Sequence, residues 1–262
     1  MGDRYKFTVE LAKEAGERVL VAREKHIEIS TKHGNPRDIV TNVDIEISNF
    51  ISQEIRSKFP NEAIYSEEAT EEDVSSGSFW SIDPIDGTSN FSRNIPHYAV
   101  VIAYVENGVP VVGVIYNPVT SEMFSFEKGK GAIFNGSQVR ISDTKNLSDA
   151  HVFFRAGSNK GLWDWGMNTY RFLLENANKT ANFGSSALDM CFVGAGRIEA
   201  CIYGNLTAID IVAAIGFVKE AGGIIVGRNG AEITGLSKEK QSILVANNQM
   251  ILNSIMGGAP FL

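Results

Sequence analysis

Apolar residues return at spacings of three and four along the first 25 residues of the chain, with charged residues between them. This spacing predicts an amphipathic helix over residues 5–25. The apolar stripe consists of Phe7, Leu11, Ala15, Val19 and Ala22. The same spacing recurs over residues 42–59 and stops before Pro60, which predicts a second helix. A polar segment rich in turn-forming residues joins the two.

Between residues 98 and 142 the pattern changes to apolar runs separated by pairs of turn-forming residues. These pairs are Asn107-Gly108, Asn117-Pro118 and Asn135-Gly136. Because Asn-Gly between apolar runs is a strong turn signal, the segment is predicted to form consecutive β-hairpins. Short strands are predicted before it at 62–68 and 79–82. The glycine-rich segment 129–136 lacks the spacing of a phosphate-binding P-loop, so we interpret it as a β-turn.

Helical and extended patterns alternate in the second half of the chain. Apolar runs predict strands at 151–154 and 198–203, and helical spacing predicts helices at 167–176, 186–193 and 210–220. The last of these helices is apolar on almost every side, so it should be buried. We therefore predict an α/β (α+β) fold in a single domain, with an N-terminal lobe of residues 1–146 and a C-terminal lobe of residues 147–262.

Composition narrows the class of protein. The chain has 44% hydrophobic and 21% charged residues, a net charge of -7 and a pI of about 5.2. This acidic balance argues against nucleic-acid binding, and no apolar run is long enough to predict a membrane helix. The two cysteines, Cys191 and Cys201, lie in apolar sequence without metal-binding spacing. Free buried thiols are typical of a reducing compartment, so we expect a cytoplasmic protein.

The segment "FWSIDPIDGTSNF" at 79–91 carries the candidate chemistry. Asp83 follows an apolar strand, and we expect the chain to turn at Pro84, which cannot continue a ladder of hydrogen bonds. Such a turn would aim Asp83, the carbonyl of Ile85 and Asp86 toward one point. Gly87 would allow close approach of a ligand, and a helix starting at Thr88 would offer N–H groups to an anion. The alternative is a capped turn with no catalytic role.

Other acids favour the catalytic interpretation. Asp44, Glu67, Glu68 and Asp210 all lie next to predicted helices or strands, and Asp210 heads the apolar helix. If these carboxylates converge, like charges about 4 Å apart repel by about 4 kcal/mol at an effective dielectric constant of 20, so cations are required. Ligands that are all oxygen indicate Mg²⁺ or Mn²⁺, and such ions beside a phosphate site indicate phosphoryl hydrolysis. The four histidines lack metal-ligand spacing and are predicted to pack or lie at the surface.

Haloacid-dehalogenase-type phosphatases offer a competing interpretation, because they carry Asp-x-Asp-Gly-Thr. This chain has Asp-x-x-Asp-Gly-Thr. Acids two positions apart on a strand face the same way, whereas acids three apart do not converge on a regular strand. The extra residue therefore argues against that class.

Taken together, these segments resemble the inositol monophosphatase family of lithium-sensitive, magnesium-dependent phosphatases. The matching segments are "DIVTNVD", "SEE", "WSIDPIDGTSNF", "GKGAIFNG", "GSSALDMCFVGAGRIEA" and "IDIVAAIGFVKEAGG", in that order. The resemblance implies a layered α-β-α-β-α sandwich of the inositol monophosphatase and fructose-1,6-bisphosphatase type. It also implies a homodimer that uses two or three Mg²⁺ ions, with Mn²⁺ as a possible substitute.

Position by position, the resemblance also implies roles for individual residues. The metal ligands would be Glu67, Asp83, the carbonyl of Ile85, Asp86 and Asp210. The catalytic residues would be Asp44, Glu67 and Thr88, with Asp44 and Thr88 orienting and deprotonating the attacking water. Phosphate and substrate would contact Asp86, Gly87, Thr88, Gly184, Ser185, Tyr203 and Asp210.

The departures from the family pattern concern the substrate. Ile209 stands where many members have Trp, and Tyr203 stands where the animal inositol enzymes have Glu. We therefore expect a phosphomonoesterase acting on myo-inositol monophosphate or a related small polyol or sugar phosphate. Fructose-1,6-bisphosphatase and histidinol-phosphatase activities stay open, as does a regulatory protein-binding role with vestigial catalysis.

Overall fold

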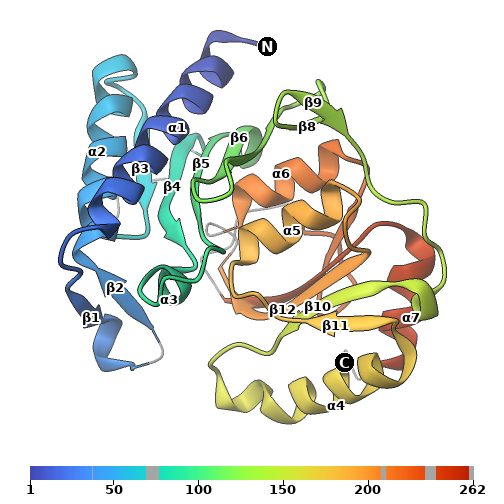
Figure 1. Ribbon diagram of the computed structural model, residues 1–262. Coiled ribbons are helices and arrows are strands. Elements are labelled where there is room, and N and C mark those ends of the chain that lie inside the picture. Colours follow the sequence, from blue (N-terminus) through green and yellow to red (C-terminus); the bar gives the residue numbers. More distant parts are fainter. Residues whose placement is uncertain (37, 69–76, 208–210, 234–239, 260–262) are drawn as a thin grey trace.

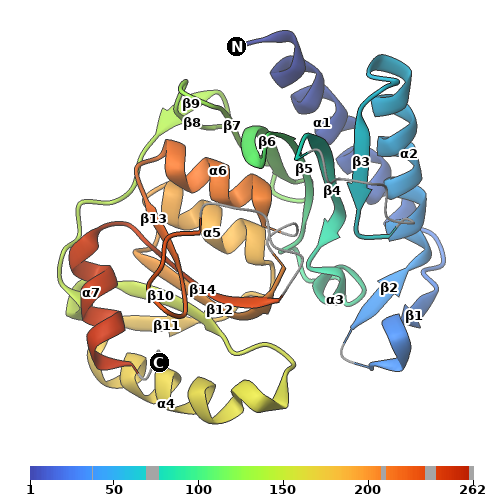
Figure 2. The same ribbon diagram turned by 180° about the vertical axis from the view of Figure 1, so that it is seen from behind.

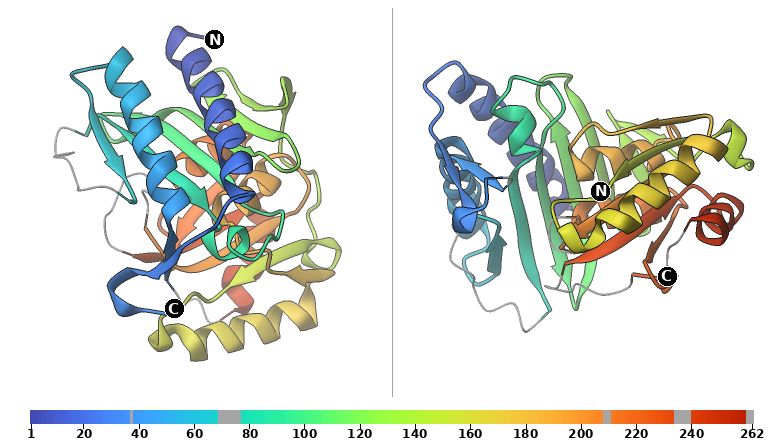
Figure 3. Two further views of the ribbon diagram at one scale, coloured as in Figure 1. Left: turned by 60° about the vertical axis from the view of Figure 1, so that its left-hand side comes forward. Right: turned by 90° about the horizontal axis from the view of Figure 1, so that it is seen from below.

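Five layers of secondary structure make up the computed structural model, which describes residues 1–36, 38–68, 77–207, 211–233 and 240–259. Two β-sheets alternate with three layers of helices, as Figures 1 and 3 show. The predicted α-β-α-β-α sandwich is therefore confirmed. None of the helices in these described ranges is both long and apolar enough to cross a bilayer.

The larger sheet has seven strands in sequence order. They are β3 (Ala63–Ser66), β4 (Phe79–Asp86), β5 (Ala99–Glu106), β6 (Val109–Asn117), β7 (Glu122–Glu127), β8 (Ala132–Phe134) and β9 (Ser137–Val139). Strands β3 and β4 pair in parallel, and the remaining neighbours are antiparallel. At the β5–β6 turn, Asn107 and Gly108 have φ angles of 51° and 76°. These left-handed conformations explain why Asn-Gly marks the predicted hairpins, which are confirmed.

The smaller sheet has five strands, in the order β11-β10-β12-β14-β13. They are β10 (His151–Arg155), β11 (Lys179–Ala181), β12 (Ala200–Leu206), β13 (Ile224–Gly227) and β14 (Gln241–Ala246). Strand β10 pairs in parallel with both β11 and β12, while β14 pairs antiparallel with β12 and β13. The pattern analysis did not predict β11, β13 or β14.

Three layers of helices cover the two sheets. The helices are α1 (Asp3–Arg23), α2 (Asn42–Lys58), α4 (Trp163–Asn176), α5 (Ser186–Gly194), α6 (Val212–Glu220) and α7 (Gln249–Gly258). Helices α1 and α2 pack on the outer face of the larger sheet, α5 and α6 lie between the sheets, and α4 and α7 pack on the outer face of the smaller sheet. Helix α7 was not predicted.

Strand β5 shows why the sequence produces two apolar faces. Val101 and Ala103 lie in the core shared with α5 and α6, whereas Val100 and Ile102 lie in the core shared with α1 and α2. Because successive side chains of a strand point to opposite faces, a continuous apolar run is required where both faces are covered.

A small hairpin and a short helix complete the fold near the ends of the larger sheet. The hairpin pairs β1 (Ile29–Thr31) with β2 (Ile39–Thr41), with the 3₁₀ turn η1 (Lys32–Gly34) between them, and the short helix is α3 (Thr88–Phe91). Seen from behind in Figure 2, the hairpin and α3 lie on the same side of the molecule. The segment that the sequence analysis described as polar and turn-rich thus contains this hairpin.

Candidate active site

The two acids of the central motif come from one irregular strand. β4 continues through Asp86, so the prediction that the strand ends and turns at Pro84 is wrong. Asp83 pairs with Val101 of β5, and Asp86 pairs with Ala99, so β4 advances by three residues where β5 advances by two. This extra residue is a β-bulge, and Pro84 is tolerated there because β3 pairs with β4 only as far as Ile82.

The bulge decides where the two carboxylates point. Residues directly opposite each other in an antiparallel pair project to the same face of the sheet. Val101 and Ala99 both lie in the core that includes α5 and α6. Asp83 and Asp86 therefore share that face, although acids three apart on a regular strand would face opposite ways. The bulge thus places both acids on one face, while their convergence on one point with the carbonyl of Ile85 stays a prediction.

Glu67 follows β3 and lies beside the end of β4, because its N–H donates to the carbonyl of Ile82 at 3.1 Å. Its carboxylate and that of Glu68 both bind the ammonium of Lys32 in η1, at 2.5 and 2.6 Å. The Glu68 side chain is 7% exposed and that of Glu67 36% exposed. The sequence analysis did not identify Lys32, because it lies in the hairpin that had no periodic signal.

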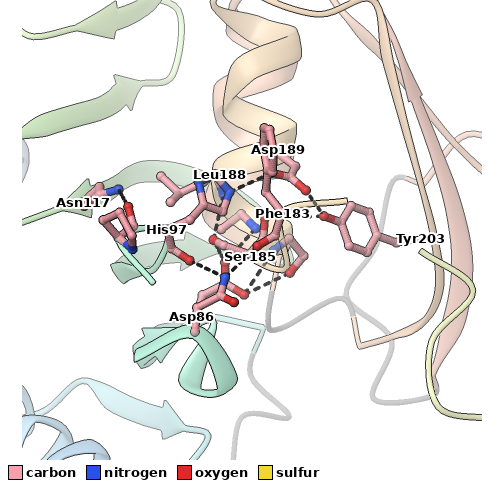
Figure 4. A network of polar contacts seen from close by, with 12 residues as sticks. Asp86, His97, Asn117, Phe183, Ser185, Leu188, Asp189 and Tyr203 are labelled. Carbon is pink, nitrogen blue, oxygen red and sulfur yellow. Dashed lines mark hydrogen bonds and ion pairs between the residues drawn. The ribbon is translucent and has the colours of Figure 1, made fainter. Parts of the chain in front are cut away.

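Asp86 reaches across to the first turn of α5, as Figure 4 shows. Its Oδ2 accepts a bond from the hydroxyl of Ser185 and one from the N–H of Ala187 at 2.9 Å. Its Oδ1 accepts bonds from the hydroxyl and N–H of Ser186, at 3.1 and 3.3 Å. A carboxylate is favoured at this position because the N-terminus of a helix carries partial positive charge. Asp86 thus ties the larger sheet to the central helices.

The side chains of Asp44 and Thr88 lie within hydrogen-bonding distance of each other. Thr41 and Asp44 form a capping box at the start of α2, in which Asp44 Oδ2 accepts bonds from the N–H and hydroxyl of Thr41. The other carboxylate oxygen, Oδ1, lies 3.1 Å from the hydroxyl of Thr88. The same hydroxyl lies 3.0 Å from the carbonyl of Ile85. One hydroxyl proton serves two acceptors, so Asp44 and Ile85 together fix the orientation of Thr88.

An open cavity of about 190 Å³ joins these groups, and it is called the catalytic cavity below. Among the residues proposed from the sequence, its walls include Glu67, Asp83, Ile85, Asp86, Gly87, Thr88, Gly184 and Tyr203. Asp44 lies behind Thr88 and is 1% exposed, and Ser185 is fully buried, whereas its neighbour Ser186 lines the cavity. Asp210 lies outside the described residues, so its predicted role stays a prediction.

Gly87 is required by its surroundings. Its φ angle is 96°, a conformation that other residues rarely adopt. A Cβ atom at this position would lie 3.1 Å from the carbonyl oxygen of His97 and 3.3 Å from Cα of Tyr98. Both contacts are with backbone, which cannot easily move away. The glycine thus keeps the backbone after Asp86 close to β5.

Burial makes the acidic groups costly to ionise. Burial raises the pKa of Asp44, and the bonds from Thr41 and Thr88 only partly oppose this. It likewise raises the pKa of Asp86 against the bonds from α5, and that of Glu68 to about 7. Burial by itself would lower the pKa of Lys32, yet the carboxylates of Glu67 and Glu68 raise it above its ordinary value. A cation beside these buried carboxylates is therefore favoured.

The chemistry of the donors fits a hard divalent cation. Glu67, Asp83, Ile85 and Asp86 all line the catalytic cavity, where their carboxylate and carbonyl groups are the oxygen ligands that such a cation prefers, and no cysteine or histidine among the described residues lines it. The ammonium of Lys32 shows that the carboxylates of Glu67 and Glu68 already attract a cation. Within the described ranges, no three acid, histidine or cysteine side chains converge closely enough to hold an ion by themselves. Asp210, the remaining predicted ligand, lies outside those ranges.

A buried network supports the wall of the cavity from α5. Asp189, which is fully buried, accepts a bond from the hydroxyl of Tyr203 and lies 2.8 Å from Nε2 of His97. Figure 4 shows these groups beside Ser185 and Asp86. Burial and the nearby charge of Asp189 raise the pKa of Tyr203 well above its ordinary value. The Tyr203 hydroxyl is therefore bound to Asp189, although Tyr203 is one of the residues that line the cavity.

Sequence reasoning missed Asp189 and gave His97 only a packing or surface role. His97 is partly buried, so packing is part of its role, but its contact with Asp189 spans 92 positions of sequence. One signal was present, namely a carboxylate inside the apolar helix "SALDMCFVG". A buried charge on such a helix requires a partner, which the chain alone does not name.

Comparison with known proteins assigns this arrangement to a family. A model of the inositol monophosphatase family matches residues 2–257. The chain belongs to the inositol monophosphatase family. The family and its relatives indicate a phosphatase that acts on small phosphorylated substrates, and its members are generally metal-dependent.

Similar proteins carry more than one name. A Thermotoga maritima protein named "Fructose-1,6-bisphosphatase/inositol-1-monophosphatase" is 34% identical over 236 residues, which cover 90% of this chain and 89% of that protein. "Nus factor SuhB" of Pasteurella multocida is 31% identical over 234 residues, covering 88% and 87%. The crystal structure of extragenic suppressor protein suhB from Bartonella henselae matches with a TM-score of 0.91 at 29% identity, covering 99% of each chain. The solved structure therefore shares the fold of this chain, and the names of these similar proteins differ.

Proposed function

We propose that the protein is a Mg²⁺-dependent phosphomonoesterase that hydrolyses myo-inositol monophosphate or a related small polyol or sugar phosphate. The observation that carries this proposal is the β-bulge, because it brings Asp83 and Asp86 to one face beside Glu67 and the carbonyl of Ile85. An all-oxygen donor set at an open cavity is the arrangement that phosphate-ester hydrolysis with hard cations requires.

Glu67, Asp83, Asp86 and the carbonyl of Ile85 would hold the cations, together with Asp210 by family resemblance. Bound Mg²⁺ supplies Lewis-acid chemistry, lowering the pKa of water and neutralising charge on the phosphate. The four bonds from α5 occupy the roughly four lone-pair sites of the Asp86 carboxylate, so binding a cation there would require Asp86 to give up a hydroxyl bond from Ser185 or Ser186.

Thr88 and Asp44 would accept the proton of the attacking water. The Thr88 hydroxyl donates toward Asp44 Oδ1 at 3.1 Å, which leaves its oxygen free to accept a bond from water on the cavity side. As the water loses its proton to Thr88, the Thr88 proton moves to Asp44. The raised pKa of Asp44 suits this role, because a stronger base accepts the proton more readily.

The backbone on the other wall would orient the phosphate. Gly87 and Gly184 both line the catalytic cavity and have φ angles of 96° and 91°. At Gly184 a Cβ atom would lie 3.1 Å from the amide nitrogen of Asn90, whose NH₂ group donates to the carbonyls of His97 and Phe183. Asn90 thus joins the two glycine segments, so their backbone groups form one wall for the ester.

Assays can distinguish among the candidate substrates, and they can distinguish the enzyme from a second, regulatory role. Tyr203 in place of an acid removes a charged contact to the sugar-like ring, so fructose 1,6-bisphosphate and histidinol phosphate belong beside inositol 1-phosphate in a substrate panel. The relative named a Nus factor supports a second candidate, a regulatory protein-binding role. The buried, hydrogen-bonded acids favour the enzyme over that role.

The test is phosphate release from this panel with Mg²⁺ and with excess chelator. We expect Mg²⁺-dependent turnover that Asp83→Asn abolishes, because the substitution removes charge while preserving shape. Asp143→Asn is the matched control, since its side chain is 87% exposed, and it should retain the wild-type rate. Absence of Mg²⁺-dependent turnover on every ester would contradict the proposal and favour the protein-binding role.

A further inference from the structure

Helix α5 is attached at two points to the segment formed by the end of β4 and its connection to β5. At its first turn, α5 donates four bonds to the carboxylate of Asp86. One turn further along, Asp189 of α5 lies 2.8 Å from Nε2 of His97, which comes two residues before β5. The helix thus receives a carboxylate from this segment at one point and presents a carboxylate to it at the other (Figure 4).

Asp189 depends on donors from outside its own helix. Its side chain is fully buried, and its two donors are the imidazole of His97 and the hydroxyl of Tyr203. A carboxylate accepts hydrogen bonds, so Nε2 of His97 contributes its N–H. Because a buried carboxylate that loses a donor is not compensated by water, this contact holds α5 more firmly than an exposed ion pair would.

The imidazole of His97 is itself held in place. Its ring lies edge-on to the rings of Phe183 and Phe192, with centroid distances of 5.3 and 5.7 Å. The backbone carbonyl of His97 accepts a bond from the side-chain amide of Asn90 at 2.7 Å, and the same amide donates to the carbonyl of Phe183 at 2.6 Å. The contact between His97 and Asp189 therefore sets the position of α5 relative to the β4–β5 connection.

Binding of a cation would disturb the first attachment and spare the second. The four bonds from α5 occupy the acceptor sites of Asp86, so a cation there would replace a hydroxyl bond from Ser185 or Ser186. This exchange weakens the hold of Asp86 on the start of α5. The contact between His97 and Asp189 uses no oxygen atom of Asp86, so it persists during the exchange.

We infer that His97 is a positioning residue of the proposed active site, because its bond to Asp189 keeps α5 in place while Asp86 exchanges a serine bond for a cation. The inference rests on the proposed phosphomonoesterase function, which requires a cation at Asp86. His97 is not one of the residues that line the catalytic cavity, so it acts through Asp189 and α5. Its bond should therefore strengthen the binding of Mg²⁺ without contacting the ion.

The experiment separates the hydrogen bond of His97 from the packing of its ring. His97→Phe keeps an aromatic ring beside Phe183 and Phe192 but donates no bond, whereas His97→Gln loses the ring and keeps an N–H donor. Titration calorimetry measures the Kd of Mg²⁺ for the metal-free proteins, without substrate. We expect His97→Phe to raise this Kd by about tenfold, as loss of a residue that supports a metal ligand does, and His97→Gln to restore most of the affinity.

Turnover of inositol 1-phosphate supplies a second measurement. Because the effect is on Mg²⁺ binding, saturating Mg²⁺ should recover most of the activity of His97→Phe, with KM for the ester unchanged. His26→Phe is the control, since His26 is exposed and does not line the catalytic cavity, and it should match the wild type in both measurements. Thermal unfolding without Mg²⁺ establishes that each variant is folded.

A second variant applies if His97→Phe does not fold. Combining His97→Phe with Asp189→Leu removes both polar partners, so no buried carboxylate is left short of a donor. This double variant should fold and should bind Mg²⁺ as weakly as expected for His97→Phe. If it failed to fold, or bound Mg²⁺ as the wild type does, the contact would serve core packing alone and the inference would be wrong.

Two results with the single variants would also overturn the inference. One is a folded His97→Phe protein with the wild-type Kd for Mg²⁺, and the other is a His97→Gln protein that binds Mg²⁺ as weakly as His97→Phe. A wild-type protein that neither binds Mg²⁺ nor hydrolyses the ester would overturn the proposed function instead. The failure of the inference and the failure of the proposed function are therefore distinct.

Discussion

At the scale of single residues, the hydroxyl of Thr88 is the group whose geometry most directly implies chemistry. It lies between Asp44 Oδ1 and the carbonyl of Ile85, and it borders the catalytic cavity. Both of these neighbours accept the hydroxyl proton of Thr88. The lone pairs of the Thr88 oxygen are therefore available to a third partner that donates a hydrogen bond. In the proposed mechanism that partner is the attacking water.

Substituting Thr88→Ala should lower kcat by about 10²–10⁴-fold, because it removes the group that accepts the proton. Thr88→Ser keeps the hydroxyl and should retain most of the rate. Both variants are assayed for kcat and for the Mg²⁺ concentration that gives half-maximal activity. If Thr88→Ala changed the Mg²⁺ requirement as strongly as kcat, the residue would be holding the shape of the site.

Candidate site residues that are close in sequence could be predicted. Contacts between residues that are far apart in sequence could not. The motif around Asp83 and Asp86 combines unusual residue types over a few positions, so it could be proposed as a site from the chain alone. Lys32 and Asp189 acquire their contacts only from neighbours that folding brings together. The contact of Lys32 with Glu67, for example, spans 35 positions.

At the scale of elements, glycines set the spacing between the larger sheet and the central helices. Gly216 of α6 faces the ring of Phe126 in β7, and a Cβ atom at Gly216 would overlap that ring. Helix α6 can therefore approach the sheet more closely than a helix with a side chain at this position.

Gly216→Ala should destabilise the protein by about 1–3 kcal/mol, because the overlap outweighs the roughly 1 kcal/mol that alanine contributes to a helix interior. Gly257→Ala in α7 is the matched control, since a Cβ atom there meets no atom within 4 Å. It should be neutral or slightly stabilising. Denaturant unfolding measures both, and equal effects at the two sites would contradict the packing argument.

Elements with a long periodic pattern were predictable, whereas short ones were not. Helices α1 and α2 repeat apolar positions over several turns, and the hairpins carry Asn-Gly pairs. Strands β11 and β13 span three and four residues, too few to establish a period of two. The β4 bulge was also hidden, because pairing register depends on the neighbouring strand.

At the scale of the whole molecule, the catalytic cavity exists only in the folded chain. Its walls come from β2, β4, α3, β10, α5 and β12 and from the connections between them, and these strands lie in three different sheets. Residues from Asp38 to Lys240 contribute to it. An unfolded chain cannot bring these oxygen atoms together, so a cation that needs several of them binds the folded state selectively.

Mg²⁺ should therefore raise the melting temperature in a concentration-dependent manner. At 100 times its Kd, a ligand of the folded state alone adds about 2.7 kcal/mol, which for a chain of this size is roughly 5–10 °C. The buried acids strengthen the expectation, because burial raises the pKa of Asp44, Glu68 and Asp86, and a nearby cation relieves that cost.

Calorimetry with a Mg²⁺ series, after treatment with chelator, measures this shift independently of turnover. Asp83→Asn should melt at a temperature that depends much less on Mg²⁺, while the exposed Asp143→Asn should follow the wild type. A wild-type melting temperature unaffected by Mg²⁺ would contradict the assignment of these oxygens as cation ligands. A shift that Asp83→Asn retained in full would place the cation elsewhere, because Asp83 is one of the acids that line the catalytic cavity.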